Sequence, residues 1–112
     1  MYFSGKTWNN GSRHSSGAGY GIKLSLLDRE ANFYPDWGIV LLFLEGNHHP
    51  IEVNVAKRSF WSKKCGELIH KEIGLWFQQK GISSWDKGKP YNVYLYHLKD
   101  NHFKVSVKPE SI

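Results

Sequence analysis

Six consecutive apolar residues at 39–44 (IVLLFL) constrain the fold more than any other stretch of this chain. A strand with one face in water would alternate between apolar and polar residues. The unbroken run therefore predicts a strand that is covered on both faces and lies at the centre of a sheet. Turn residues follow at 45–47 (EGN), and residues 51–55 (IEVNV) alternate. We therefore predict an antiparallel hairpin over residues 39–55.

Helical spacing of apolar residues predicts the main helix of the chain over residues 62–80. Ser62 is a suitable N-cap and Gly81 a suitable left-handed stop, which would place Lys63 and Lys64 in the first turn. A second, short helix is predicted over residues 26–33, with Ser25 as its N-cap. The apolar face of the main helix, which we expect to hold the core, contains Cys65, Ile69, Ile73 and Trp76.

Three further strands are predicted, over residues 22–25, 91–98 and 103–107. In the last hairpin, a three-residue loop at 99–101 with a left-handed Asn101 would place Leu95 opposite Val105. The predicted fold class is therefore α+β. We expect a curved, mostly antiparallel sheet of about five strands, which could form an open barrel, packed on the 62–80 helix.

Length and composition predict one folded domain over residues 1–112. The chain has 40% hydrophobic and 22% charged residues, which is typical of a globular protein. Residues 9–19 are rich in Gly, Ser and Asn, and we expect a flexible loop there. The single cysteine cannot form an internal disulfide, which favours a reducing, cytoplasmic setting. No apolar run approaches the roughly 20 residues of a membrane helix, so we expect no membrane partner.

The net positive charge is carried by the second half of the chain. Residues 1–50 contain four basic and four acidic residues, whereas residues 51–112 contain eleven basic and six acidic ones, which gives the whole net charge of +5. A local basic excess favours encounter with polyanions such as nucleic acids. The sequence contains no nucleophile elbow and no Walker lysine, which favours a non-enzymatic role. We expect no catalytic residue, metal or cofactor.

The candidate nucleic-acid contacts fall into three groups. The first lies before and at the start of the predicted 62–80 helix, where free N–H groups could also hold a phosphate. The second lies beyond the end of that helix, and the flexible loop adds one arginine. In the third group, outward-facing tyrosines could stack on bases beside a lysine. These residues are Lys57, Arg58, Lys63 and Lys64; Lys87, Lys89 and Arg13; and Tyr94, Tyr96 and Lys104.

Other readings of the same residues stay open. The lysine stems before the helix could simply cover Phe60 and Trp61. The tyrosines could pack at a protein interface, which would make the chain a protein–protein interaction module or a homodimer. A small hydrolase using Glu72 or the histidines is a minor alternative. His48 and His49 are adjacent in a loop, and such neighbours rarely converge on one metal ion.

The order of the predicted elements resembles that of the B3-like pseudobarrel DNA-binding domains. In both, a strand, a short helix, a hairpin and a long helix are followed by a glycine-containing turn that enters a closing strand pair. Here the turn and the strand after it are residues 87–93 (KGKPYNV), and the pair ends at residues 103–105 (FKV). The resemblance covers residues 20–107. It implies non-enzymatic recognition of double-stranded DNA through strand-end loops.

Overall fold

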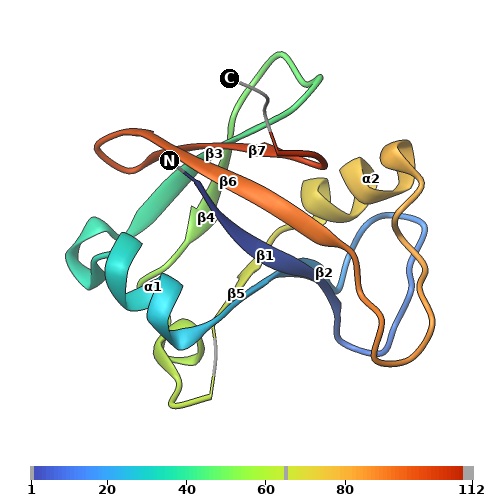
Figure 1. The fold of residues 1–112 in the computed structure, drawn as a ribbon, viewed down its shortest axis with the longest axis horizontal. Helices are drawn as coiled ribbons and strands as arrows, with labels where there is room; N and C mark the ends of the chain where they lie inside the picture. Colours follow the sequence, from blue (N-terminus) through green and yellow to red (C-terminus); the bar gives the residue numbers. More distant parts are fainter. Residues whose placement is uncertain (1, 65, 110–112) are drawn as a thin grey trace.

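The computed structural model describes residues 2–64 and 66–109, in which one seven-stranded sheet curves into a nearly closed barrel (Figure 1). The strand order is β4-β3-β7-β6-β1-β2-β5, and every neighbouring pair is antiparallel except β3 with β7. Two α-helices accompany the sheet. The elements are β1 (Tyr2–Asn9), β2 (Tyr20–Leu24), α1 (Leu26–Asn32), β3 (Ile39–Leu44), β4 (Ile51–Asn54), β5 (Gly66–Ile69), α2 (Lys71–Lys80), β6 (Asn92–Lys99) and β7 (His102–Ser106).

The predicted hairpin is confirmed as β3 and β4, with Val40 opposite Val53. The prediction that its first strand is central and covered on both faces is wrong. β3 is second from one edge of the strand order, and its side chains alternate between buried and partly exposed. The apolar residues on its outer face are only half covered, as Phe43 is by a ring contact with His102 at 5.7 Å.

The main helix is shorter than predicted, because residues 66–69 form β5 instead of its first turns. β5 pairs with β2, and this pairing directs Leu68 into the barrel interior. The helix α2 begins at Lys71, and its N-cap is His70, whose Nδ1 accepts a hydrogen bond from the Glu72 amide at 3.0 Å. Gly81 ends α2 in the left-handed conformation, as predicted. The predicted cap at Ser62 is wrong.

The short helix is confirmed as α1, and Ser25 Oγ accepts a hydrogen bond from the Asp28 amide at its start. In the last hairpin Leu95 lies opposite Val105, as predicted. The loop itself differs from the prediction. Lys99 pairs with His102, a register shift lies between His97 and Lys99, and the left-handed residue is Asp100. The residue that the prediction added to the loop is therefore accommodated instead by a bulge in β6, which keeps Leu95 opposite Val105.

The barrel interior forms one hydrophobic core in which aromatic rings predominate. Ile73 and Trp76 of α2 are fully buried in it, which confirms their predicted role, whereas Ile69 is half-buried on β5. Cys65 lies outside the described residues. Among the described helices, none is long and apolar enough to cross a membrane. The largest fully buried side chains include Trp76, Phe33, Phe60, Phe77 and Phe103.

Candidate nucleic-acid interface

Three lysines from separate parts of the chain line one open hollow of about 460 Å³. Lys6 of β1 and Lys23 of β2 are Cα partners across the strand pair. Both point outward because their neighbours along each strand, such as Thr7 and Ile22, are buried. Lys64 comes from the segment between β4 and β5. The apolar part of the hollow is formed by Leu24 at the end of β2 and by Leu26 and Leu27 at the start of α1.

The positive charges around this hollow are only partly compensated. Lys6 Nζ donates a hydrogen bond to Asn92 Oδ1, and Lys23 has Glu67 as its cross-strand neighbour on β5. Within residues 2–64 and 66–109, none of the three lysines forms an ion pair. All three lysines are exposed, and cations gathered on one surface raise the local positive potential that attracts anions. The hollow is therefore suited to a phosphate or carboxylate group.

We call residues 57–64 the basic arm, because this segment carries four of the predicted cations. It stands at the end of the barrel where β2 ends and β5 begins, since Leu24 pairs with Gly66. Figure 1 shows the arm projecting from the body of the barrel. A 3₁₀ turn over Arg58–Trp61 shapes it. The arm holds Lys57, Arg58, Lys63 and Lys64, of which only Lys57 is partly buried.

The alternative in which lysine stems cover Phe60 and Trp61 is not needed to explain the arm. Phe60 is fully buried in the core, with its ring 5.5 Å from that of Phe33. The Trp61 ring is covered by the guanidinium of Arg29 at 5.1 Å. These contacts leave the exposed side chains of Lys63 and Lys64 available to solvent. Neither lysine lies in a helix, so the predicted anion site at a helix start is wrong.

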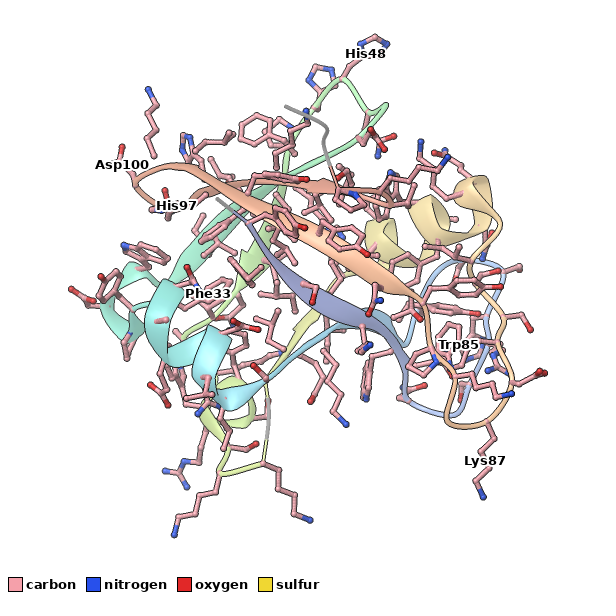
Figure 2. All side chains as sticks on the ribbon, viewed as in Figure 1. Phe33, His48, Trp85, Lys87, His97 and Asp100 are labelled. Carbon is pink, nitrogen blue, oxygen red and sulfur yellow. The ribbon has the colours of Figure 1, made fainter. Side chains whose placement is uncertain are left out.

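A second basic group lies at the opposite end of the barrel. The last part of β1 lies beside the loop before β6 there, since the Thr7 amide donates to the Tyr91 carbonyl at 2.9 Å. The Arg13 guanidinium lies over the Trp85 ring at 5.2 Å, which joins the loop after β1 to the loop before β6. Lys87 and Lys89 are exposed nearby, and Figure 2 shows Lys87 projecting from this end. In Figure 1 the basic arm projects at the lower left and these loops at the right, with β2 between them.

The loop at 10–19 is tied to α2. Gln78 Nε2 donates to the carbonyl oxygens of His14 and Ser15 at 3.3 and 3.2 Å. Gly17 and Gly74 touch backbone to backbone, so that a Cβ on Gly74 would lie 2.3 Å from the Gly17 oxygen. Residue 9, included in the predicted flexible segment, is the last residue of β1. The mobility of the remainder stays a prediction.

The predicted tyrosine group lies on the outer face of the sheet, as expected. Tyr96 pairs across strands with both Lys104 and Tyr2. The Tyr2 ring lies 5.5 Å from the Tyr94 ring and 5.3 Å from the Tyr96 ring. Tyr2 and Lys6 have the same orientation on β1, so the tyrosines and the hollow share one outer surface. The rings are half-covered by each other, and stacking on bases stays a prediction.

The histidines and Glu72 do not gather into a metal site in the described part of the chain. No group of three or more His, Cys, Asp or Glu side chains there could hold a metal ion. Glu72 lies half-buried in the first turn of α2, and His48 and His49 are exposed in the β3–β4 loop. Figure 2 shows His48 at the tip of that loop, away from Lys87.

Lys6 and Lys23 are the residues that sequence reasoning missed. Lys23 stands between two buried residues in a predicted strand, and this alternation places it on the outer face. That signal was present in the sequence. Lys6 carried no such signal, because residues 2–9 include Gly5 and Asn9, whose residue types are depleted in strands.

Comparisons with protein-family models, with curated proteins and with solved structures found no match to this chain.

Proposed function

We propose that this chain binds double-stranded DNA without catalysing a reaction, chiefly through phosphate contacts. The observation that carries the proposal is the convergence of Lys6, Lys23 and Lys64 on one hollow. Three exposed lysines without an ion pair among the described residues, with exposed basic loops on either side, resemble the electrostatic footprint of nucleic-acid-binding surfaces. Phosphate contacts of this kind position a protein on DNA without reading its sequence.

The distance between the two basic groups favours a duplex over a single strand. They stand at opposite ends of β2, whose five residues span roughly 16 Å at about 3.3 Å per residue. Cations this far apart can contact both backbones of a duplex across its major groove, which is about 12 Å wide. A single strand would instead need a continuous groove with stacked aromatic rings.

The resemblance to the B3-like pseudobarrel domains supports the same proposal. That resemblance implies duplex recognition through strand-end loops. Here Arg58, Lys63, Arg13, Lys87 and Lys89, the exposed cations of the predicted interface outside the hollow, lie in the β4–β5 loop, the β1–β2 loop and the loop before β6. Within this proposal, basic residues of the three loops contact the duplex, and Lys6 and Lys23 contact the part of its backbone that lies between these loops.

Fluorescence anisotropy with a labelled duplex tests the proposal. We expect the double variant Lys6→Gln/Lys23→Gln to bind at least about tenfold more weakly than the wild type, because it loses two charge-assisted phosphate contacts. The matched control is Lys99→Gln/Lys108→Gln, which removes the same charge from exposed positions outside the hollow. We expect the control to bind within about twofold of the wild type.

Two results would overturn the proposal. The first is a wild-type chain that binds neither duplex nor single-stranded DNA at low salt. The second is an equal loss in the two double variants, which would show that net charge and not the hollow sets the affinity.

A protein interface is the second candidate, and the outer tyrosine cluster favours it. Tyr2 is 49% exposed, and its contacts with Tyr94 and Tyr96 create an aromatic surface on β1 and β6. Aromatic residues of this kind are enriched at interfaces. Light scattering across a concentration series tests the homodimer form of this candidate, and a monomer at every concentration would exclude it.

A further inference from the structure

We infer that Arg29 is a positioning residue that holds the basic arm in its binding shape before a ligand arrives. This inference rests on the proposed function. Arg29 belongs to α1 and is only 3% exposed. Its Nη1 donates to the carbonyl oxygens of Phe60 at 2.8 Å and Ser62 at 2.7 Å. One guanidinium nitrogen therefore holds two backbone positions of the arm.

The arm is fastened by an aromatic ring as well. The guanidinium of Arg29 lies over the Trp61 ring, and Trp61 Nε1 donates to the Val55 carbonyl at 2.7 Å. The 3₁₀ turn is therefore tied to the end of β4 on one side and to α1 on the other. At the start of β5, a Cβ on Gly66 would lie 2.4 Å from the Phe60 oxygen and 3.1 Å from Arg29 Cδ. Only glycine leaves room for this arrangement.

The burial of Arg29 is costly for a residue that would merely fill the core. Its Nε is buried and has no hydrogen-bond partner among the described residues, an arrangement that costs the desolvation free energy of that N–H group. Its only ion pair in the described part of the chain is with Glu30, whose side chain is 61% exposed. An apolar side chain of similar volume would usually stabilise such a site as well or better. The fork of donors, which neither lysine nor an apolar residue supplies, is what fixes the arm.

A preformed arm lowers the cost of binding. Loops that become ordered only on binding lose conformational entropy at that moment, which weakens affinity. Arg29 joins α1, which provides Leu26 and Leu27 to the hollow, to the arm that provides Lys64. The two walls of the hollow are therefore held together in the free protein, and Arg29 itself contacts no ligand.

The experiment compares Arg29→Met and Arg29→Lys with Arg58→Gln, which removes an exposed charge of the arm itself. Duplex affinity is measured over a series of salt concentrations, and amide hydrogen exchange is measured over residues 57–64. For both Arg29 variants we expect binding at least about tenfold weaker, with the salt slope unchanged and exchange in the arm accelerated. For Arg58→Gln we expect a salt slope smaller by about 0.9 and unchanged exchange.

Three results would overturn the inference. The first is a smaller salt slope in the Arg29 variants, which would make Arg29 a phosphate contact. The second is an affinity within about twofold of the wild type despite fast exchange in the arm, and the third is unchanged exchange in the arm. If Arg29→Met does not fold, Trp61→Phe removes the bond to Val55 from the other side, and the same pattern is expected. If the wild type binds no duplex, the proposed function fails, while the exchange readout still decides whether Arg29 holds the arm.

Discussion

Individual side chains near α1 divide into those that hold the core and those that face solvent. Phe33 follows the last turn of the helix and is 2% exposed. Its ring stacks on Phe103 with centroids 4.9 Å apart, and it meets Phe60 edge to face. Leu27 in the first turn is 84% exposed. One helix thus supplies both a central core ring at its end and a solvent-facing leucine at its start.

This contrast gives a prediction at the level of single residues. Phe33→Ala should lower the free energy of unfolding by about 3–5 kcal/mol, because it removes a ring from a packed aromatic cluster and leaves a cavity. Leu27→Ala in the same helix is the control and should change stability by less than about 0.5 kcal/mol. Urea denaturation followed by tryptophan fluorescence measures both. Similar values for the two variants would mean that Phe33 is not a central core residue.

At the scale of elements, α2 and the β1–β2 loop depend on a contact between two glycines. Glycine inside a helix normally lowers stability relative to alanine by about 1 kcal/mol. Gly74 lies in the middle of α2, and the backbone of Gly17 occupies the space where its Cβ would be. Gly17 has a positive φ of 87°, which other residues rarely adopt. The close approach of loop and helix explains why glycine is needed at both positions.

The expected result of Gly74→Ala is therefore opposite in sign to helix propensity. We expect the substitution to destabilise the protein by about 1–3 kcal/mol, because the loop must move away from α2. Amide exchange at residues 13–18 should accelerate. Gln79→Ala, at an exposed position of the same helix, is the control and should be neutral or slightly stabilising. A stabilised Gly74→Ala variant would contradict the packing of this loop on α2.

At the scale of the whole molecule, the barrel brings basic residues that are far apart in the sequence together on its surface. The basic arm and the two strand lysines come from distant parts of the chain and meet at one hollow, and the loops around Trp85 lie at the other end of β2 (Figure 1). The net charge of +5 is therefore less informative than its distribution.

Duplex affinity should accordingly depend steeply on salt. Each neutralised phosphate contributes about −0.9 to the slope of log K against log salt concentration, so about four contacts give a slope near −3.6. We expect affinity to fall roughly a hundredfold between about 50 and 200 mM salt. Titrations at several salt concentrations measure this slope. A slope near zero would contradict a phosphate-dominated interface.

Local chemistry determined several parts of this structure. The hairpin of β3 and β4, the Ser25 cap of α1, the Gly81 stop of α2 and the pairing of Leu95 with Val105 could all be predicted from the sequence. Each depends on turn chemistry, capping or apolar periodicity within a short stretch of chain.

The tertiary structure alone decided the seven-stranded barrel and the site. Residues 66–69 satisfy a helical pattern as well as a strand, and only pairing with β2 resolves this in favour of β5. Likewise β1 contains poor strand formers and exists because β2 and β6 pair with it on either side. Long-range pairing overrides local propensity in such strands, because the neighbouring strands supply the hydrogen bonds and the packing. The same pairings bring Lys6, Lys23 and Lys64 to one hollow, a convergence that no local pattern in the sequence encodes.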